Sequence, residues 1–145
     1  MFRRILVPMD DTALSERALD TALTLAGRNG ARVWPLFVRA ENLSPDASHM
    51  DDLDVEAVEG ALVASVRARI RDDHGVHPDH IHPELRTGTP ESCILDAARD
   101  HRIDLIVMGT HGRHGLVDWL AGSTTERVLR QAHCAMLVLR DPPDA

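Results

Sequence analysis

The stretch Asp104-Leu-Ile-Val-Met-Gly-Thr-His-Gly112, followed after nine residues by Gly122-Ser-Thr-Thr125, decides the fold. The apolar run from Ile103 to Met108 is typical of a buried strand, and a segment with helical spacing follows the second motif. This order of strand, glycine-rich loop and helix start is where α/β proteins hold phosphates. Glycine lets a backbone adopt positive φ and approach a ligand, while the first helical turn offers unpaired N–H donors and a partial positive charge. The stretch therefore predicts an α/β protein with a phosphate-binding loop. The hydroxyl groups of Ser123, Thr124 and Thr125 would add hydrogen-bond donors to this loop.

Strand-like and helix-like segments alternate through the rest of the chain. Thr12 is a candidate N-cap, Asn29-Gly30 a candidate helix end, and Thr89-Pro90 a second candidate helix start. Such alternation predicts right-handed βαβ units and a parallel sheet covered by helices on both faces. Pro35 lies inside a predicted strand, so either that strand is bulged or its register leaves the missing N–H unpaired. The predicted strands span 4–9, 33–38, 80–86, 104–108 and 135–139. The predicted helices span 12–29, 55–70, 90–101 and 123–131. In the second of these helices we expect one buried stripe, formed by Val55, Val58, Leu62, Val66 and Ile70.

Length and composition favour a single domain, residues 1–145, and we expect the protein to be cytoplasmic. The 145 residues are 43% hydrophobic, which is enough for one buried core, and no apolar run approaches the roughly 20 residues that span a bilayer. We expect no membrane segment, no signal peptide, and reduced thiols at Cys93 and Cys134. The formal net charge of −7 argues against nucleic-acid binding, although a small anionic ligand can still bind. We expect the four histidines between 74 and 82 to be surface residues and not a metal site.

Three common phosphate-binding classes do not fit. All 16 basic residues are Arg, so a Walker A loop, which needs Lys, is excluded. A dinucleotide fingerprint would place GxGxxG after the first strand, where Pro8-Met-Asp-Asp11 stands. A receiver domain would need the same absent Lys.

If the first and fourth strands are neighbours, Asp10-Asp11-Thr12 faces the glycine loop across one crevice, and a carboxylate opposite N–H donors suits the ribose and phosphates of a nucleotide. Asp10 is also a candidate cap of the first helix.

Gly109, Gly112, Gly122 and Ser123 resemble the G-2x-G-9x-G-(S/T) signature of the universal stress protein family, in its ATP-binding branch. The likeness extends over essentially the whole chain, including 5–10, 88–91 and 135–139. It implies an open five-stranded parallel sheet of order 3-2-1-4-5, Rossmann-like and similar to adenine nucleotide alpha hydrolases. ATP, with Mg²⁺, would lie between the first and fourth strands.

The resemblance also implies a site and an assembly. Asp10 and neighbouring backbone would meet the adenosine, Val38 would meet the adenine, and the glycine loop would line the phosphates. Arg113 joins this set because its guanidinium can bind two phosphate oxygens. We expect a homodimer through 135–139 and a regulatory stress-response protein with slow or no hydrolysis and no catalytic residue; the alternatives are a slow nucleotide hydrolase and a nucleotide-free interaction module. The expected nucleotide-binding residues are Pro8, Met9, Asp10, Val38, Met108, Gly109, Gly112, Arg113, Gly122, Ser123 and Thr124.

Overall fold

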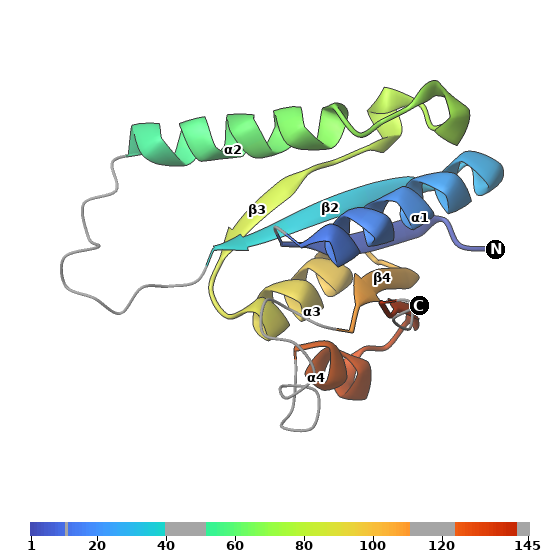
Figure 1. Ribbon diagram of the computed structural model, residues 1–145. Helices are drawn as coiled ribbons and strands as arrows, with labels where there is room; N and C mark the ends of the chain where they lie inside the picture. Colours follow the sequence, from blue (N-terminus) through green and yellow to red (C-terminus); the bar gives the residue numbers. More distant parts are fainter. Residues whose placement is uncertain (11, 40–51, 111–123, 142–145) are drawn as a thin grey trace.

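A parallel five-stranded sheet, in the order β3-β2-β1-β4-β5, forms the centre of the protein (Figure 1). The computed structural model describes residues 1–10, 12–39, 52–110 and 124–141. Both the predicted strand order and the predicted alternation of strands and helices are confirmed. In chain order the elements are β1 (Arg4–Met9), α1 (Ala13–Asn29), β2 (Arg32–Arg39), α2 (Asp52–Arg67), the 3₁₀ turns η2 (Asp72–His74) and η3 (Pro78–His80), β3 (Glu84–Thr87), α3 (Pro90–Asp100), β4 (Leu105–Gly109), α4 (Thr124–Gln131) and β5 (Ala135–Leu139).

Two hydrophobic clusters cover the two faces of the sheet. Successive strand residues point to opposite faces, so Ile5 packs with α1 whereas Leu6 packs with α3 and α4. Both residues are fully buried. Continuous apolar strands are thus explained by helices on both sides, as the sequence predicts.

Local capping chemistry sets the ends of α1. The Thr12 hydroxyl accepts the Ser15 N–H at 3.2 Å, and Gly30 ends the helix in the left-handed conformation with φ of 65°. Thr89 and Pro90 take the predicted positions at the start of α3, but the Thr89 side chain makes no capping hydrogen bond.

Among the side chains of α2 that the structure describes, residues 56–67, the one that is fully buried is Val66, near the C-terminal end. Val66 is 1% exposed, whereas Val58 is 40% exposed, so the prediction of one continuous buried stripe is wrong at Val58. The helix is fixed where Val66 joins the cluster around α1 and where the Arg69 guanidinium pairs with Glu16 of α1. The N-terminal half of α2 extends away from the sheet (Figure 1).

The strand β3 is shorter than the predicted span 80–86. His80 ends the 3₁₀ turn η3, and Ile81 forms only an isolated bridge with Val33 before the strand begins at Glu84. Pro83, immediately before that strand, has no N–H to contribute to a ladder.

The position of Pro35 follows from this interruption. The Val33 carbonyl accepts the His82 N–H at 2.8 Å, so the backbone groups of Val33, and of Pro35 two residues later, face β3. The regular ladder between β2 and β3 starts only at Leu36 opposite Glu84. The missing N–H of Pro35 therefore falls in a break of the ladder, which is the second of the two sequence-based interpretations.

Candidate functional site

The hydrogen-bonded ladder between β1 and β4 ends before the carboxyl edge of the sheet, and the unpaired stretch of the two strands beyond it is called the gap below. The two strands are paired only at Ile5 opposite Leu105 and Leu6 opposite Ile106. On their outer sides β1 stays paired with β2 as far as Met9, and β4 stays paired with β5 as far as Gly109. In the order β3-β2-β1-β4-β5, β1 and β4 are also the strands at which the chain changes direction across the sheet. Open α/β sheets bind ligands at this position.

Asp10 lies at the β1 side of the gap, and local hydrogen bonds fix it. Its Oδ1 accepts the Thr12 N–H at 2.9 Å and also the Thr12 hydroxyl. The Ser15 hydroxyl donates to the Asp10 carbonyl at 2.8 Å. Asp10 therefore shapes the start of α1, as the capping interpretation predicts. Its side chain is exposed, and Oδ2 makes no hydrogen bond with the described residues, so this oxygen is available to a ligand hydroxyl.

Gly109 lies at the β4 side, and its small size serves packing. A Cβ at this position would lie 2.6 Å from Leu14 Cδ2 and 2.7 Å from Leu14 Cγ. The φ angle of Gly109 is not positive, so here the glycine is required by its neighbour in α1 and not by its backbone conformation. The sequence pattern gave no signal for Leu14, because the contact joins residues far apart in the chain.

Two threonines lie beside Gly109 at the end of β4. The Thr125 hydroxyl, in the first turn of α4, donates to the Gly109 carbonyl at 2.7 Å. Thr110 continues from β4 and is 4% exposed, and among the described residues its hydroxyl has no hydrogen-bond partner. A buried hydroxyl without a partner is costly unless something else satisfies it. Nothing in the sequence indicates Thr110, whereas Thr125 is one of the three hydroxyl residues that it suggests as donors at the helix start.

The remaining expected residues divide into three groups. Val38 and Met108 pack with the cluster on the α3 face, so the ends of β2 and β4 contribute to the same side of the sheet. Pro8 and Met9 end β1, and Thr124 is the first residue of α4. Gly112, Arg113, Gly122 and Ser123, together with Asp11, lie outside the described residues.

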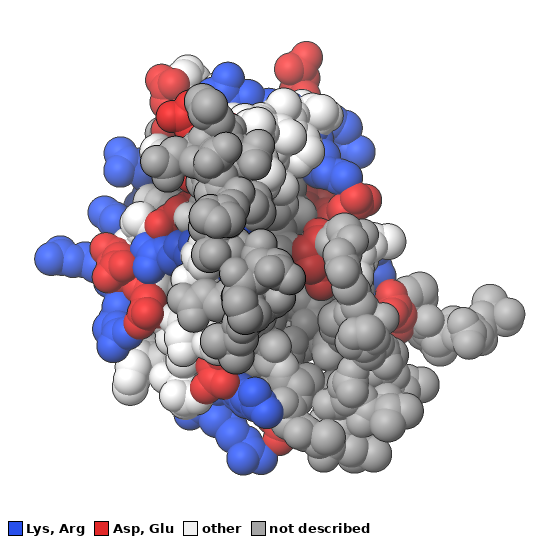
Figure 2. Space-filling model, turned by 90° about the vertical axis from the view of Figure 1, so that its left-hand side faces the viewer, with Lys and Arg blue, Asp and Glu red and all other residues white. Residues whose placement is uncertain are grey.

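Figure 2 shows the face of the molecule toward which the strands end. In its coloured part acidic and basic side chains lie close to one another on both sides, and neither sign dominates. The overall charge of −7 is therefore not concentrated into one acidic field on the visible part of this face.

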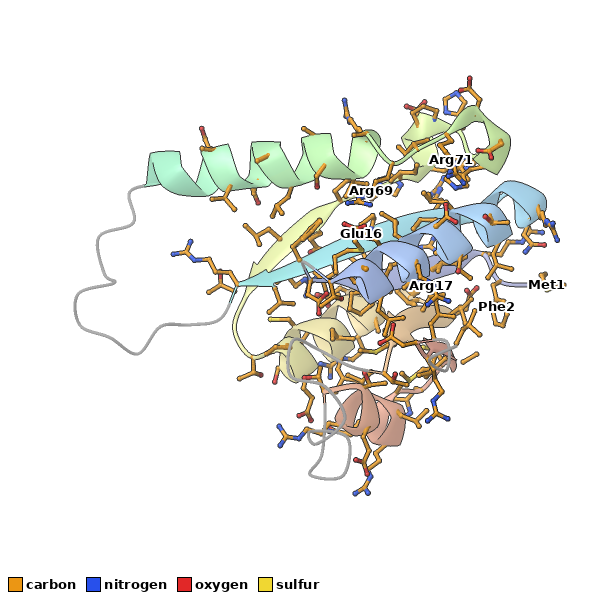
Figure 3. The ribbon with its side chains drawn as sticks, viewed as in Figure 1. Met1, Phe2, Glu16, Arg17, Arg69 and Arg71 are labelled. Atoms are coloured by element: carbon orange, nitrogen blue, oxygen red, sulfur yellow. The ribbon has the colours of Figure 1, made fainter. Side chains whose placement is uncertain are left out.

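Two grooves lie elsewhere on the described surface. One, of about 450 Å³, lies between α1 and the end of α2. Figure 3 shows Glu16 and Arg17 of α1 on one side of it and Arg69 and Arg71 on the other. Its two carboxylates are paired within the groove, since Glu16 meets Arg69 and Asp20 meets Arg71 at 3.2 Å. The Arg17 guanidinium donates instead to the Arg140 carbonyl at 3.5 Å. A second groove of about 420 Å³ lies between α3 and the segment 131–134, which begins at the last residue of α4.

The four histidines have different surroundings and do not form one cluster, although the rings of His77 and His80 lie 6.1 Å apart. His74 is buried, accepts the Arg71 N–H at Nδ1, and lies 2.6 Å from Asp20 through Nε2, so it is a core residue and not the surface residue predicted. His82 stacks on Trp34 with ring centroids 5.0 Å apart. Burial, and then the charge of Arg32, lower the pKa of His82. Among the described residues no three metal-binding side chains come together.

Cys93 and Cys134 are not joined by a disulfide bond. In the part of the chain that the structure describes, no helix has both the length and the apolar character needed to cross a membrane. Cys93 is buried in α3, whereas Cys134 is half-buried before β5. Burial raises the pKa of the Cys134 thiol, and the nearby Asp104 carboxylate adds to the effect.

Comparisons with known proteins give one family. The model of the universal stress protein family matches residues 1–140. Universal stress protein MJ0531 of Methanocaldococcus jannaschii is 31% identical over 98% of this chain and 84% of its own length. Universal stress protein YxiE of Bacillus subtilis is 28% identical over 97% of this chain and its full length.

Solved structures of this family share the fold. The universal stress protein UspA from Lactobacillus plantarum superposes with a TM-score of 0.76 at 30% identity, covering 96% of this chain and 98% of its own. A universal stress protein solved in complex with cAMP has a TM-score of 0.75 at 22% identity, covering 95% and 97% of the two chains. At that identity the second likeness concerns the fold alone.

Proposed function

The chain belongs to the universal stress protein family, and from this premise we propose that it is a regulatory protein that binds ATP, with Mg²⁺, in the gap between β1 and β4. One observation carries the proposal: the β1–β4 ladder stops after Leu6 and Ile106, although both strands continue toward the carboxyl edge. A paired edge would leave no space for a ligand there.

The residues around the gap fit a nucleotide chemically. On the β1 side, the exposed Oδ2 of Asp10 can accept a hydrogen bond from a ribose hydroxyl. On the β4 side, the unpartnered Thr110 hydroxyl and the start of α4 can donate to phosphate oxygens. We propose that Val38, near the end of β2, contacts the adenine. Bound Mg²⁺ would neutralise phosphate charge in a chain whose formal net charge is −7.

The glycine loop supplies the rest of the proposed phosphate site through Gly109, Gly112, Gly122 and Ser123, with Thr124 and Arg113. One of these positions already has a structural role, because Gly109 makes room for Leu14. The position of Thr125 supports the same arrangement, since its hydrogen bond ties the first turn of α4 to the end of β4.

We propose binding with slow or no hydrolysis. Hydrolysis needs a positioned base and stabilisation of the developing charge. Asp10 is the carboxylate that the described residues place at the β1 side, and one of its oxygens is already engaged by Thr12. Such a carboxylate is better suited to holding a ribose than to accepting a proton.

We further propose a homodimer through β5. This strand is at the edge of the sheet and pairs with β4 on one side only. Its five residues, Ala135–Leu139, are apolar, and four of them are partly buried. An apolar edge strand is a template for pairing with another chain, and a second copy would satisfy it.

Isothermal titration of the purified protein with Mg·ATP tests the proposed ligand. Saturable binding in the wild type that is lost or at least tenfold weaker in Asp10→Ala supports it. Asp79→Ala is the matched control, because Asp79 is an exposed carboxylate in η3, remote from the gap, and its variant should bind as the wild type does. No heat of binding at millimolar Mg·ATP would remove the proposal. Phosphate release that is unchanged in Asp10→Ala and Gly122→Val would show that an accompanying hydrolase activity comes from a contaminant.

A further inference from the structure

The backbone of β1 turns alternate residues toward β2 and toward β4. The Arg3 carbonyl accepts the Arg32 N–H at 2.9 Å, on the β2 side. The Arg4 carbonyl accepts the Asp104 N–H at 3.0 Å, on the β4 side. Because N–H and C=O groups alternate along a strand, Leu6 and Pro8 face β4 as Arg4 does.

Pro8 stands where the next bond of the β1–β4 ladder would form. With Leu6 opposite Ile106, a residue at position 8 would donate its N–H to the Val107 carbonyl. Proline has no N–H, so this bond cannot form, and the ladder ends one step earlier. On its other side β1 remains paired with β2 through Pro8 and Met9, because that ladder uses the N–H groups of Val7 and Met9.

The same alternation identifies which groups of β4 face the gap. The Thr110 N–H donates to the Leu139 carbonyl of β5 at 2.9 Å. Val107 and Gly109 therefore face the opposite way, toward β1. The Val107 carbonyl is an acceptor and the Gly109 N–H is a donor, and the ladder pairs neither of them with β1. Along the strand these two groups lie two residues apart, on one side of the backbone.

We propose that Pro8 is a positioning residue that keeps β1 and β4 apart at the carboxyl edge and thereby leaves two backbone groups of β4 to a ligand. The Val107 carbonyl accepts a ribose hydroxyl, and the Gly109 N–H donates to a phosphate oxygen. This role rests on the proposed nucleotide binding. Strands joined by a ladder lie about 4.8 Å apart, which leaves no room for a ligand group between their backbones. One restored hydrogen bond at position 8 is therefore sufficient to obstruct the gap.

Pro35 provides a matched control within the same sheet. It also lies inside a central strand, but its missing N–H faces β3 and not the gap. Pro35→Ala thus makes the same chemical change as Pro8→Ala, with a new N–H in a parallel strand, at a place that should not affect the ligand.

Amide hydrogen exchange followed by NMR measures whether the amide at position 8 is hydrogen-bonded in the ladder, and it needs no ligand. In Pro8→Ala we expect the new amide at position 8 to exchange at least 100-fold more slowly than an unstructured amide. We also expect the affinity for Mg·ATP, measured by titration calorimetry, to fall at least tenfold. In Pro35→Ala the affinity should stay within twofold of the wild type. If Pro8→Ala does not fold, Pro8→Val, with a residue type favoured in strands, carries the same N–H.

The two readouts separate this inference from the proposed function. An amide at position 8 that exchanges freely would overturn the role of Pro8, whether or not the wild type binds nucleotide. A protected amide with unchanged ATP affinity would also overturn it, because the gap would then not depend on the break. A wild type that binds no adenine nucleotide would overturn the proposed function and, with it, the ligand roles of Val107 and Gly109.

Discussion

Replacing Gly109 by alanine should destabilise the protein through Leu14. The added Cβ would lie 2.6 Å from Leu14 Cδ2, closer than unbonded carbon atoms approach. Leu14 is 4% exposed, so its side chain cannot move into solvent without losing its packing. Inserting a methyl group into a well-packed place costs about 1–3 kcal/mol, and the better strand propensity of alanine returns about 0.5 kcal/mol. We expect a net loss of about 1–2 kcal/mol in the free energy of unfolding.

A double-mutant cycle isolates the contact. Leu14→Ala alone should cost about 2–4 kcal/mol, because it leaves a cavity beside β4. With that cavity present the methyl group at position 109 has space, so Gly109→Ala should then cost close to nothing. The two changes should therefore couple by about 1–2 kcal/mol.

Urea denaturation followed by circular dichroism measures each variant. With a slope of about 2 kcal/mol per molar urea, Gly109→Ala should lower the midpoint by about 0.5–1 M in the wild-type background and hardly at all with Leu14→Ala. Costs that add within about 0.5 kcal/mol would refute the packing role of Gly109. The glycine would then have to be explained by the ligand alone.

Three further outcomes are expected. His74→Ala should lower the free energy of unfolding by about 2 kcal/mol in urea melts, because it removes the buried ring that bonds Asp20. Arg71→Ala, which removes an exposed partner of the same Asp20, should lower it by less than about 1 kcal/mol. His82 has a lowered pKa in the folded protein, so the unfolded chain takes up its proton first, and stability should fall as the pH drops below about 6.5; His82→Phe should flatten that part of a stability-against-pH curve, and an unchanged slope would contradict it. Cys134, whose pKa is raised by burial, should react with a disulfide reagent at pH 7.5 more slowly than free cysteine. An equal or faster rate would show that burial does not raise the pKa of this thiol.

The features predicted from sequence are those set by local chemistry. Thr12 and Gly30 bound α1 because a hydroxyl acceptor and a left-handed glycine are needed at those two ends. Apolar runs located β1, β2, β4 and β5, because each of these strands contributes side chains to a cluster on at least one face. The span predicted for β3 was less accurate, since no residue of that strand belongs to either cluster. The strand order followed from the family resemblance and not from the residues alone.

What sequence reasoning missed depends on contacts between distant residues. The exposure of Val58 reflects how α2 leaves the sheet, and periodicity carries no information about that geometry. His74 is buried because Gly27 lets the chain approach α1 closely: a Cβ there would lie 1.7 Å from the His74 carbonyl oxygen. The late start of β3 and the place of Pro35 share one cause, since two prolines interrupt the same region of the ladder.

The candidate site shows the same division. The sequence indicated Asp10 and Gly109 at opposite sides of a crevice, and the structure places them at the ends of β1 and β4. The opening between the strands, the buried Thr110 hydroxyl and the support from Leu14 emerge only when the strands are assembled.

Mass spectrometry of small molecules released from the freshly purified protein tests nucleotide binding most directly. We predict that denaturing the protein releases ATP, or that protein freed of nucleotide gains thermal stability when Mg·ATP is added, by about 2.7 kcal/mol at 100 times the dissociation constant. Absence of any adenine nucleotide in the released fraction, together with an unchanged melting temperature at millimolar Mg·ATP, would contradict the proposal that the gap between β1 and β4 is a nucleotide site.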